Sequence, residues 1–338
     1  MSKILVTGGA GYIGSHTVVE LVNAGYTPII VDNFSNSEER VLNGIAQILG
    51  QQVVCHKVDC TDAKVLQEVF TKEGDIAGVI HFAAFKAVGE SVAEPLKYYH
   101  NNVAGLVTLL QVMEANKVTR LVFSSSCTVY GIPEKLPVTE ETPTQKANSP
   151  YGNTKKIDEE ILRDVATSGS ALRTIALRYF NPIGAHESAL IGELPLGVPN
   201  NLVPFITQTA AGLRDSLTVY GTDYDTPDGS CIRDYVHVVD LAKAHVAAIK
   251  RLEKEEPAAF EVFNVGTGQG SSVLEVVKAF EKATSKPFPY KTGPRRAGDV
   301  PAIYADVTKA TEELGFKTSL SLEESLASSW AWQQALGK

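Results

Sequence analysis

The segment that most limits how this chain can fold lies at its beginning, where a short apolar run leads into a glycine-rich turn. Residues 4–6 have the character of a buried strand, Gly8, Gly11 and Gly14 follow, and a helical pattern then runs to about Ala24. Residues without a Cβ let backbone N–H groups approach a pyrophosphate at the start of the helix. Glycine turns occur for other reasons too, so the flanking strand and helix are what make this pattern informative. The segment predicts a dinucleotide site.

Apolar runs then alternate with helical patterns through the first half of the chain. Strand-like runs cover residues 28–31, 53–58, 79–84, 120–123 and 174–179. This alternation is typical of an α/β fold with a Rossmann-like, doubly wound parallel sheet. After Pro182 the chain becomes rich in Gly, Pro, Asn and Asp. We therefore expect residues 1–181 to form an NAD-binding Rossmann domain, with residues 236–265 returning to it, and residues 182–338 to form a smaller C-terminal α/β domain that binds the substrate.

The choice of dinucleotide depends on the end of the second strand-like run. That run ends in Asp32, 18 residues beyond Gly14, where a Rossmann fold binds the ribose hydroxyls of the adenosine. A carboxylate there repels a 2′-phosphate, so the sequence favours NAD over NADP. The alternative is that Asp32 only begins the turn that continues with Asn33.

A second chemical signal lies at residues 149–155. Ser149 is a good helix N-cap and Pro150 suits the first helical position, so Tyr151 and Lys155 should lie one turn apart on the same helix face. A cation beside a phenol favours the phenolate and lowers its pKa from about 10. The alternative is an exposed tyrosine beside a solvated lysine. The dinucleotide signature makes a proton-transfer pair the better interpretation.

Polar residues elsewhere fit the same site. Ser124, Ser125 and Ser126 follow a strand-like run, and ligands of such sheets bind beyond the carboxyl ends of the strands. These hydroxyls could position a sugar hydroxyl or a carbonyl, or they could only cap the sheet edge. Arg295 and Arg296 could together bind a diphosphate, or they could be a solvated charge pair.

Composition excludes several other classes of protein. The net charge is −8 and there is no block of Lys and Arg, so we expect no nucleic-acid partner. No apolar stretch approaches the length of a membrane span, and the first residues do not resemble a signal peptide. The four cysteines form no C-x-x-C pair, so we expect reduced thiols in a cytoplasmic protein. The seven histidines have no metal-site spacing, and we expect no metal.

Over nearly its whole length the sequence resembles the extended short-chain dehydrogenase/reductase family, and within it the branch that epimerises UDP-hexoses. Departures from that pattern are small: Ala84 and Cys127 stand where other small residues are common. The resemblance rests on residues 8–17, 32–36, 81–91, 124–131, 149–155, 177–182, 200–202, 233–237 and 295–301.

The resemblance implies a role for each of these residues. Tyr151 would be the base, Lys155 would lower its pKa and hold the nicotinamide ribose, and Ser126 would bond the sugar hydroxyl. Cofactor contacts are implied for Gly8, Gly11, Tyr12, Ile13, Gly14, Asp32, Asn33, Asn36, Ser37, Asp59, Cys60, Phe82, Ala83, Ala84, Lys86, Asn101, Ser124, Tyr151, Lys155 and Tyr179. Substrate contacts are implied for Lys86, Ser126, Thr128, Tyr151, Asn181, Asn200, Asn201, Leu202, Thr218, Tyr220, Arg233, Arg296, Asp299 and Ile303.

The implied activity is the interconversion of UDP-glucose and UDP-galactose. It proceeds by transient oxidation at C4 with tightly bound NAD, rotation of the 4-keto sugar and return of the hydride. In the family the position of Ile303 lines the hexose pocket, so a residue smaller than Tyr implies weaker but real activity on UDP-N-acetylhexosamines. The family also implies a homodimer that packs through residues 95–116 and 150–166.

Two other activities share part of this pattern. A nucleotide-sugar 4,6-dehydratase also begins with C4 oxidation, but it carries an Asp-Glu pair where this chain has Ser126, Cys127 and Thr128. An NAD-sensing regulator would bind the cofactor without chemistry, and an intact Tyr151, Lys155 and Ser126 argue against it.

Overall fold

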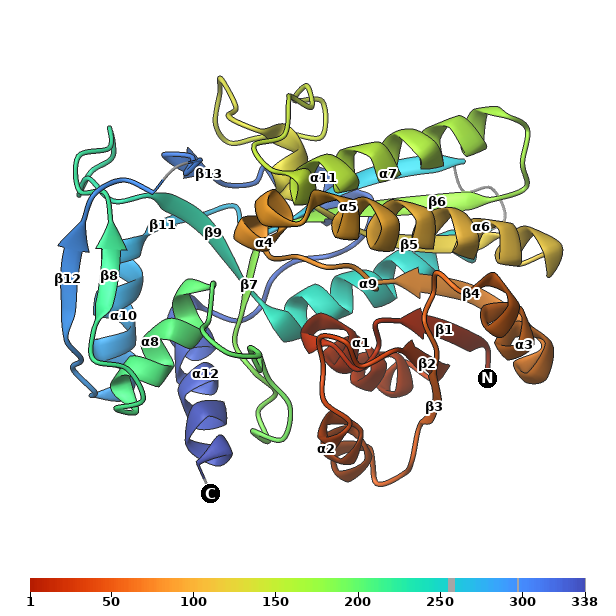
Figure 1. The fold of residues 1–338 in the computed structure, drawn as a ribbon, viewed down its shortest axis with the longest axis horizontal. Helices are drawn as coiled ribbons and strands as arrows, with labels where there is room; N and C mark the ends of the chain where they lie inside the picture. Colours follow the sequence, from red (N-terminus) through yellow and green to blue (C-terminus); the bar gives the residue numbers. More distant parts are fainter. Residues whose placement is uncertain (255–258, 297, 338) are drawn as a thin grey trace.

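A seven-stranded sheet forms the core of the computed structural model, which describes residues 1–254, 259–296 and 298–337. Every neighbouring pair of strands is parallel. Figure 1 shows this sheet on the right of the view, with the N-terminus beside it. Across the sheet the strands are β10 (Phe260–Val265), β6 (Arg173–Tyr179), β5 (Arg120–Ser126), β4 (Ile76–His81), β1 (Lys3–Thr7), β2 (Thr27–Asp32) and β3 (Val54–Lys57).

This strand order confirms the predicted fold class. Without β10 the order is 3-2-1-4-5-6, which is that of the doubly wound dinucleotide-binding fold. The direction of travel across the sheet reverses beside β1, and ligands of such folds bind outside the carboxyl ends of the strands at that point. The glycine turn follows β1 directly, so the fold puts it where a ligand is expected.

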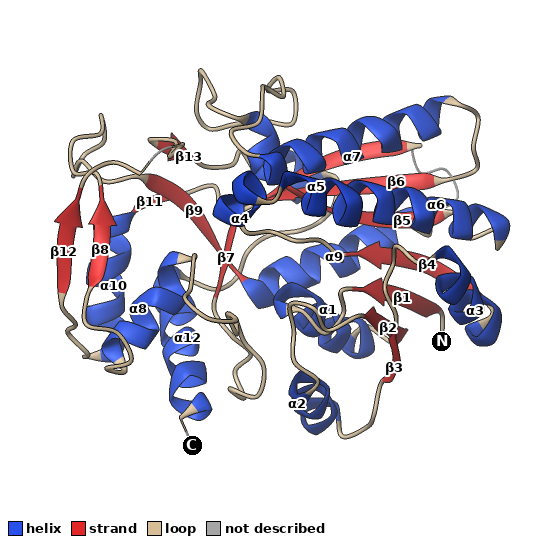
Figure 2. Cartoon of the chain, viewed as in Figure 1, coloured by secondary structure: helices blue, strands red, loops and turns tan. Residues whose placement is uncertain are grey.

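Helices cover both faces of the sheet, as Figure 2 shows. On one face, alternate strand residues such as Ile4, Val6 and Ile30 pack with Val18 and Leu241 from two of the helices. On the other face, strand residues pack against three further helices. The first face carries α1 (Tyr12–Asn23), α2 (Arg40–Leu49) and α9 (Val238–Leu252), and the second carries α3 (Ala63–Glu73), α6 (Gly105–Ala115) and α7 (Pro150–Thr167).

The long helix predicted near residues 95–116 is divided in the structure. A short helix α5 (Pro95–Tyr98) passes into a π-helical segment η1 (Tyr99–Ala104), and α6 follows. Such π-helical segments often occur at functional sites. Here Asn102 of η1 accepts a hydrogen bond from the N–H of Phe85 (2.9 Å) and donates one to Thr154 of α7 (3.0 Å). The segment thereby links the loop after β4 to the helix that carries Tyr151.

The remainder of the chain builds a smaller region, on the left in Figure 1. A third apolar cluster, which includes Val203, Phe280 and Leu326, joins its helices. The strand β9 lies between β11 and β13 and also pairs with β7, while β8 pairs with β12. The strands are β7 (Asn181–Ile183), β8 (Leu217–Tyr220), β9 (Ile232–His237), β11 (Gly270–Ser272), β12 (Tyr290–Gly293) and β13 (Ala302–Ile303). The helices are α8 (Leu202–Ala210), α10 (Val273–Thr284) and α12 (Leu322–Leu336), and the short α4 (Val88–Ala93) and α11 (Thr308–Glu312) complete the elements discussed.

No helix in the described part of the chain is long and apolar enough to cross a membrane. All four cysteines are free.

Candidate active site

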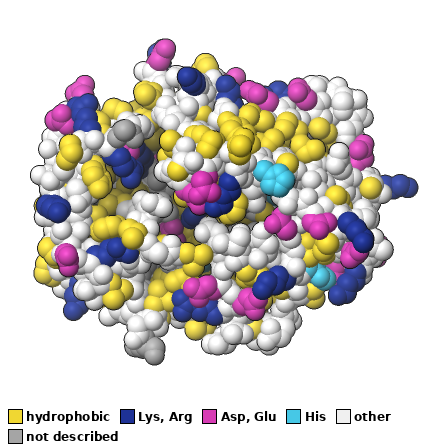
Figure 3. All heavy atoms as spheres, in the orientation of Figure 1, with side chains coloured by type: hydrophobic (Ala, Val, Ile, Leu, Met, Phe, Trp, Pro, Cys, Tyr) yellow, Lys and Arg dark blue, Asp and Glu magenta, His cyan; other side chains and the backbone are white. Residues whose placement is uncertain are grey.

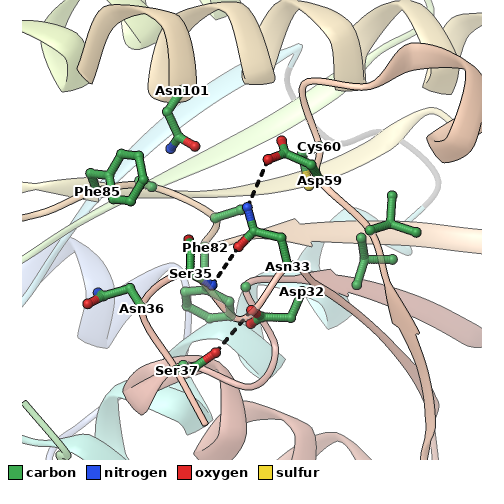
Figure 4. A pocket seen from close by; sticks show the side chains of 16 residues that line it. Asp32, Asn33, Ser35, Asn36, Ser37, Asp59, Cys60, Phe82, Phe85 and Asn101 are labelled. Carbon is green, nitrogen blue, oxygen red and sulfur yellow. Dashed lines mark hydrogen bonds between the residues drawn. The ribbon is translucent and has the colours of Figure 1, made fainter. Parts of the chain in front are cut away.

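A cavity opens at the carboxyl ends of β1, β2 and β4, where the strand order reverses. Its empty volume is about 610 Å³, including its open mouth. Figure 4 shows polar side chains from the loops after β2 and β3, together with the aromatic rings of Phe82 and Phe85, around it. The lining includes twelve predicted cofactor residues, which are Gly8, Gly11, Asp32, Asn33, Asn36, Ser37, Asp59, Cys60, Phe82, Ala83, Ala84 and Asn101.

The glycine turn has the close approaches that the sequence predicted. A Cβ on Gly8 would lie 2.8 Å from the backbone N of Ala83, and a Cβ on Gly14 would lie 2.2 Å from the carbonyl oxygen of Gly8. Gly11 is the N-cap of α1, and it forms no side-chain cap. The first N–H groups of the helix therefore have no side-chain acceptor at the point where Gly8 and Gly11 line the cavity, which is the arrangement that binds a pyrophosphate.

Two carboxylates line the cavity beyond the glycine turn. Oδ2 of Asp32 accepts from the N–H of Ala10 (3.0 Å), and Oδ1 accepts from the N–H of Phe34 (2.8 Å) and the hydroxyl of Ser37 (3.1 Å). A carboxylate offers about four acceptor sites, so Oδ2 can still accept a ribose hydroxyl. These residues fit NAD, because the cavity combines a place for a pyrophosphate with a free acceptor for a ribose.

The second carboxylate, Asp59, is fixed by its neighbours. Burial would raise its pKa, but hydrogen bonds from Thr61 and Asn33 outweigh burial and lower the pKa of Asp59. The amide of Asn33 donates to Asp59 over 2.9 Å, as Figure 4 shows. Asp59 is therefore a charged acceptor at neutral pH in the lining of the cavity.

Tyr151, Lys155 and Ser126 come together beside the ends of β5 and β6. Ser149 caps α7 as predicted, because its hydroxyl accepts from the N–H of Gly152 (3.2 Å). Tyr151 and Lys155 are both buried on the same side of α7. The amine of Lys155 donates to the carbonyl oxygen of Ser124 (2.8 Å), and Tyr151 is hydrogen-bonded to Ser126.

The electrostatics of this trio differ from the sequence expectation. Burial raises the pKa of Tyr151, and the hydrogen bond with Ser126 lowers it only in part. Lys155 is not among the groups that act on the phenol, and burial lowers the pKa of its own amine. The expectation that Lys155 lowers the pKa of the phenol is therefore wrong for the chain by itself. The physical reason is that full burial penalises the phenolate more than the hydrogen bond with Ser126 compensates.

A buried ion pair contacts the serine run at the end of β5. Arg178 donates to both carboxylate oxygens of Glu159, at 2.9 Å and 2.6 Å, and Glu159 also accepts from the hydroxyl of Ser125 (2.5 Å). Arg178 also donates to the hydroxyl of Tyr130 (3.1 Å), which in turn donates to Asn264 (2.7 Å). This network joins α7, β5, β6 and β10, so it fixes the strand ends on which the serines stand.

The predicted diphosphate residues occupy two separate places. Arg233 donates to the carbonyl oxygens of Ile232 (2.8 Å) and Val300 (2.6 Å), and its other nitrogen lies 3.9 Å from Asp299. Arg296 also pairs with Asp299 (3.2 Å). Arg295 does not join them, because it pairs with Asp223 (2.9 Å) and covers the ring of Tyr224. In the structure Arg295 and Arg296 therefore do not converge on one place, while Arg233 and Arg296 do.

Other predicted substrate residues lie around this point. Ile303 of β13 is in register with Arg233 of β9, is 5% exposed, and packs in an apolar cluster that includes Phe180. Tyr220 of β8 lies beneath the guanidinium of Arg296, with its ring centroid 5.9 Å from the carbon Cζ. Four more predicted residues lie on this smaller region, at Asn181, Asn200, Leu202 and Thr218, and Thr128 donates to Ser126 (3.0 Å).

Two further predicted residues meet through a side chain that the sequence analysis missed. Glu193 lies 3.4 Å from the amine of Lys86 and accepts from the amide of Asn201 (2.6 Å). Phe85, Ser35, Val31 and Val58 also line the cavity and were not predicted. Val31 and Val58 belong to the predicted strand-like runs, and Ser35 and Phe85 lie in the motifs of residues 32–36 and 81–91, but nothing in the sequence marked these four as lining residues.

The fold and this site define the class of protein. A doubly wound sheet with a glycine turn after β1, and a buried tyrosine four residues before a lysine beside a serine, are the features of a short-chain dehydrogenase/reductase enzyme. A family model described as GDP-mannose 4,6 dehydratase matches residues 5–328.

Comparison with individual proteins narrows the family further. The chain is 51% identical to UDP-glucose 4-epimerase of Dictyostelium discoideum over 98% of this chain and 95% of that protein, and 49% identical to that of Homo sapiens over 98% and 96%. The crystal structure of UDP-glucose 4-epimerase from Bifidobacterium longum in complex with NAD+ and UDP is 51% identical, with a TM-score of 0.94 over 99% of this chain and 98% of that chain. The chain belongs to the UDP-glucose 4-epimerase family.

Proposed function

We propose that this protein interconverts UDP-glucose and UDP-galactose by transient oxidation at C4 of the hexose, with NAD as its bound cofactor. The observation that carries the proposal is that Tyr151 and Ser126 lie at the same edge of the parallel sheet as the cavity that fits NAD, in a chain of this family. Relatives of the chain have been crystallised with NAD and UDP, and the residues described above offer a place for each.

Cofactor binding follows from the cavity. The N-terminus of α1 and Gly8 would hold the pyrophosphate, Asp32 would bind the adenosine ribose, and Asp59 would bind the adenine. Asp32 disfavours NADP, because it repels a 2′-phosphate. Lys155 is held against Ser124 with its remaining N–H groups available for the nicotinamide ribose. When bound, NAD supplies the acceptor and donor of the hydride at C4 of the sugar.

The proton at O4 of the hexose is handled by the chain itself. Ser126 is fixed by two donors from Thr128, which leave its own hydroxyl proton to bond O4 or Tyr151. The oxygen Oη of Tyr151 takes the O4 proton as C4 is oxidised and returns it once the other face of C4 has been reduced. Because burial raises the pKa of Tyr151, we infer that the positive charges of Lys155 and the oxidised nicotinamide ring must act together to favour the phenolate.

Inversion at C4 requires the 4-keto sugar to present its other face while UDP stays bound. Arg233 is held by two backbone carbonyls and converges with Arg296 on Asp299, so it offers a fixed cationic site for the diphosphate. Ile303 and Phe180 offer the hexose an apolar surface with few hydrogen bonds. Firm binding of UDP and loose binding of the hexose are what the rotation needs.

A 4,6-dehydratase is the nearest other activity, and the family model carries such a name. Residues 126–128 supply no carboxylate for removal of water across C5 and C6. The relatives named above are epimerases at about half identity over the whole chain. These observations favour epimerisation over dehydration and over cofactor sensing without chemistry.

We further propose that the enzyme is a cytoplasmic homodimer. Leu96 is 82% exposed, and Val88, Val92 and Val107 add apolar surface to the same region. Figure 3 shows hydrophobic side chains gathered over α5, α6 and α7 on this face. An exposed apolar patch of this kind is typical of a protein interface, and it supports the packing of residues 95–116 and 150–166 against a second copy.

We also propose that the chain divides into two domains, one of residues 1–181 with 236–265 and the other of residues 182–338.

The test of the activity is incubation of the purified protein with UDP-galactose and no added NAD. We expect UDP-glucose to form until the two sugars reach equilibrium, because the cofactor is regenerated in each turnover. A protein that releases NAD on denaturation but forms no UDP-glucose would contradict the proposed activity while leaving the cofactor site intact.

A further inference from the structure

The side chain of Glu193 connects two predicted ligand residues that lie far apart in the sequence. Its carboxylate is 3.4 Å from the amine of Lys86, which follows β4, and it accepts a hydrogen bond from the amide of Asn201 (2.6 Å), which precedes α8. Lys86 itself is about half exposed, while the Glu193 side chain is only 12% exposed. The carboxylate is therefore the fixed partner, and the lysine is the one that it positions.

Glu193 is held by the C-terminal helix. Its carbonyl oxygen accepts from the indole N–H of Trp332 in α12 (2.8 Å). A Cβ on the preceding residue, Gly192, would lie 2.5 Å from the indole ring, so the loop lies directly against Trp332. Farther back, the N–H of Gly184 donates to Ser329 (3.0 Å), and the hydroxyl of Tyr12 donates to the carbonyl oxygen of Gly184 (2.6 Å). The loop that carries Glu193 is thus anchored at both α12 and α1.

The side chain of Asn201 bonds to Glu193 and does not cap its own helix. Asparagine is a favoured N-cap and Asn201 occupies that position of α8, yet its side chain forms no cap bond. Its amide is turned to Glu193 instead. The first N–H groups of α8 are therefore left without that side-chain acceptor, next to the predicted substrate residue Leu202.

We propose that Glu193 is a positioning residue for the sugar nucleotide: it fixes the amine of Lys86 and diverts the side chain of Asn201, so that both residues and the N-terminus of α8 are placed for the substrate. The inference rests on the proposed function, since Lys86 and Asn201 were predicted as substrate residues. Glu193 contacts no reacting atom in this scheme and acts only through its two partners. A lysine side chain loses considerable rotamer freedom when it is fixed, so a partner that fixes it in advance improves binding.

The test compares Glu193→Gln with Glu187→Gln, a change of an exposed glutamate on the same loop. The loss of one hydrogen bond to a charged group corresponds to about a tenfold weaker affinity, so we expect Glu193→Gln to raise KM for UDP-galactose about tenfold with kcat nearly unchanged. Glu187→Gln should leave both constants as in the wild type. Binding of UDP, measured by titration calorimetry, should weaken in parallel, and this readout does not require turnover.

A double-mutant cycle separates positioning from a merely structural role. If Glu193 acts through Lys86, Lys86→Met combined with Glu193→Gln should raise KM by less than the product of the two single effects. Multiplicative effects, or a KM within twofold of wild type for Glu193→Gln, would overturn the inference. Should Glu193→Gln fail to fold, Glu193→Asp combined with Lys86→Met gives the same cycle with the charge retained. A wild type that binds UDP but forms no UDP-glucose would contradict the proposed function alone, and the calorimetric comparison would still decide the role of Glu193.

Discussion

Replacement of Tyr151 by Phe should abolish turnover with little effect on the stability of the fold. The change removes one oxygen and keeps the ring, which is buried beside Ser126. A positioned general base contributes about 10²–10⁴-fold to the rate, so we expect kcat to fall by at least two orders of magnitude, or about 3–5 kcal/mol in the activation free energy. Ser126 keeps its two bonds from Thr128, so the free energy of unfolding should change by only about 1 kcal/mol.

Tyr130→Phe is the matched control, because it removes the same atom from another buried tyrosine. The hydroxyl of Tyr130 accepts from Arg178 and donates to Asn264, and all three residues are buried. Its removal leaves Asn264 with an unsatisfied oxygen, so we expect a loss of about 1–3 kcal/mol of stability with most of the activity retained. The assays are the rate of UDP-glucose formation from UDP-galactose, the NAD content after denaturation, and urea unfolding. A Tyr151→Phe variant with a tenth of the wild-type kcat would refute Tyr151 as the base.

Four further predictions follow from the same structure. Denatured protein should release NAD(H), because Asp32 disfavours a 2′-phosphate; release of NADP(H) would contradict this. Mass spectrometry of the reaction mixture should find no sugar nucleotide that has lost water, since the dehydratase alternative alone would produce one. Ile303→Tyr should lower kcat/KM for UDP-N-acetylgalactosamine relative to UDP-galactose, and an unchanged ratio would show that other residues set the pocket size. Finally, burial lowers the pKa of His16 and of His81 from 6.5 to about 3, and that of His245 to about 4. Between pH 6.5 and the lowered pKa the unfolded state binds more protons at these histidines than the folded state does, so acidification lowers the free energy of unfolding. At about pH 5 the loss is about 2 kcal/mol for each histidine. An equal urea midpoint at about pH 7 and pH 5 would contradict this.

The sequence was most informative where local signals and chemistry coincide. Residues 4–24 show a short apolar run, three spaced glycines and a helical pattern, and the structure has the strand, turn and helix in that order. The capped helix of Tyr151 was predicted from Ser149 and Pro150 for the same reason. Positions that line the cavity could be named because parallel strands bring their carboxyl ends to one edge of the sheet.

What could not be predicted depends on contacts between distant segments. Strands β7 and β13 have three and two residues, too few for any periodicity. They form only because each pairs with β9, which is distant from β7 and β13 in the sequence. Nothing in the sequence distinguishes Glu193 from other loop glutamates, because its position depends on the contact with Trp332 of α12. Helix α12 did carry a usable signal, the capping box of Ser321 and Glu324, which the sequence analysis did not use. The raised pKa of Tyr151 likewise follows from burial, which no spacing of residues reveals.

The place of β10 in the sheet matters during synthesis of the chain. Strand β6 ends at Tyr179 and β10 begins at Phe260, so 80 residues must be added before the edge of β6 is paired. At about 5–20 residues per second, the ribosome leaves that edge open for roughly 4–16 s. Until residue 252 has been added α9 is also incomplete, and the apolar side chains of Ile175 and Leu177 that it later covers remain in water. An unpaired edge beside such a surface is a site of misassembly, so a nascent chain stalled before residue 265 should depend on chaperones to remain monomeric.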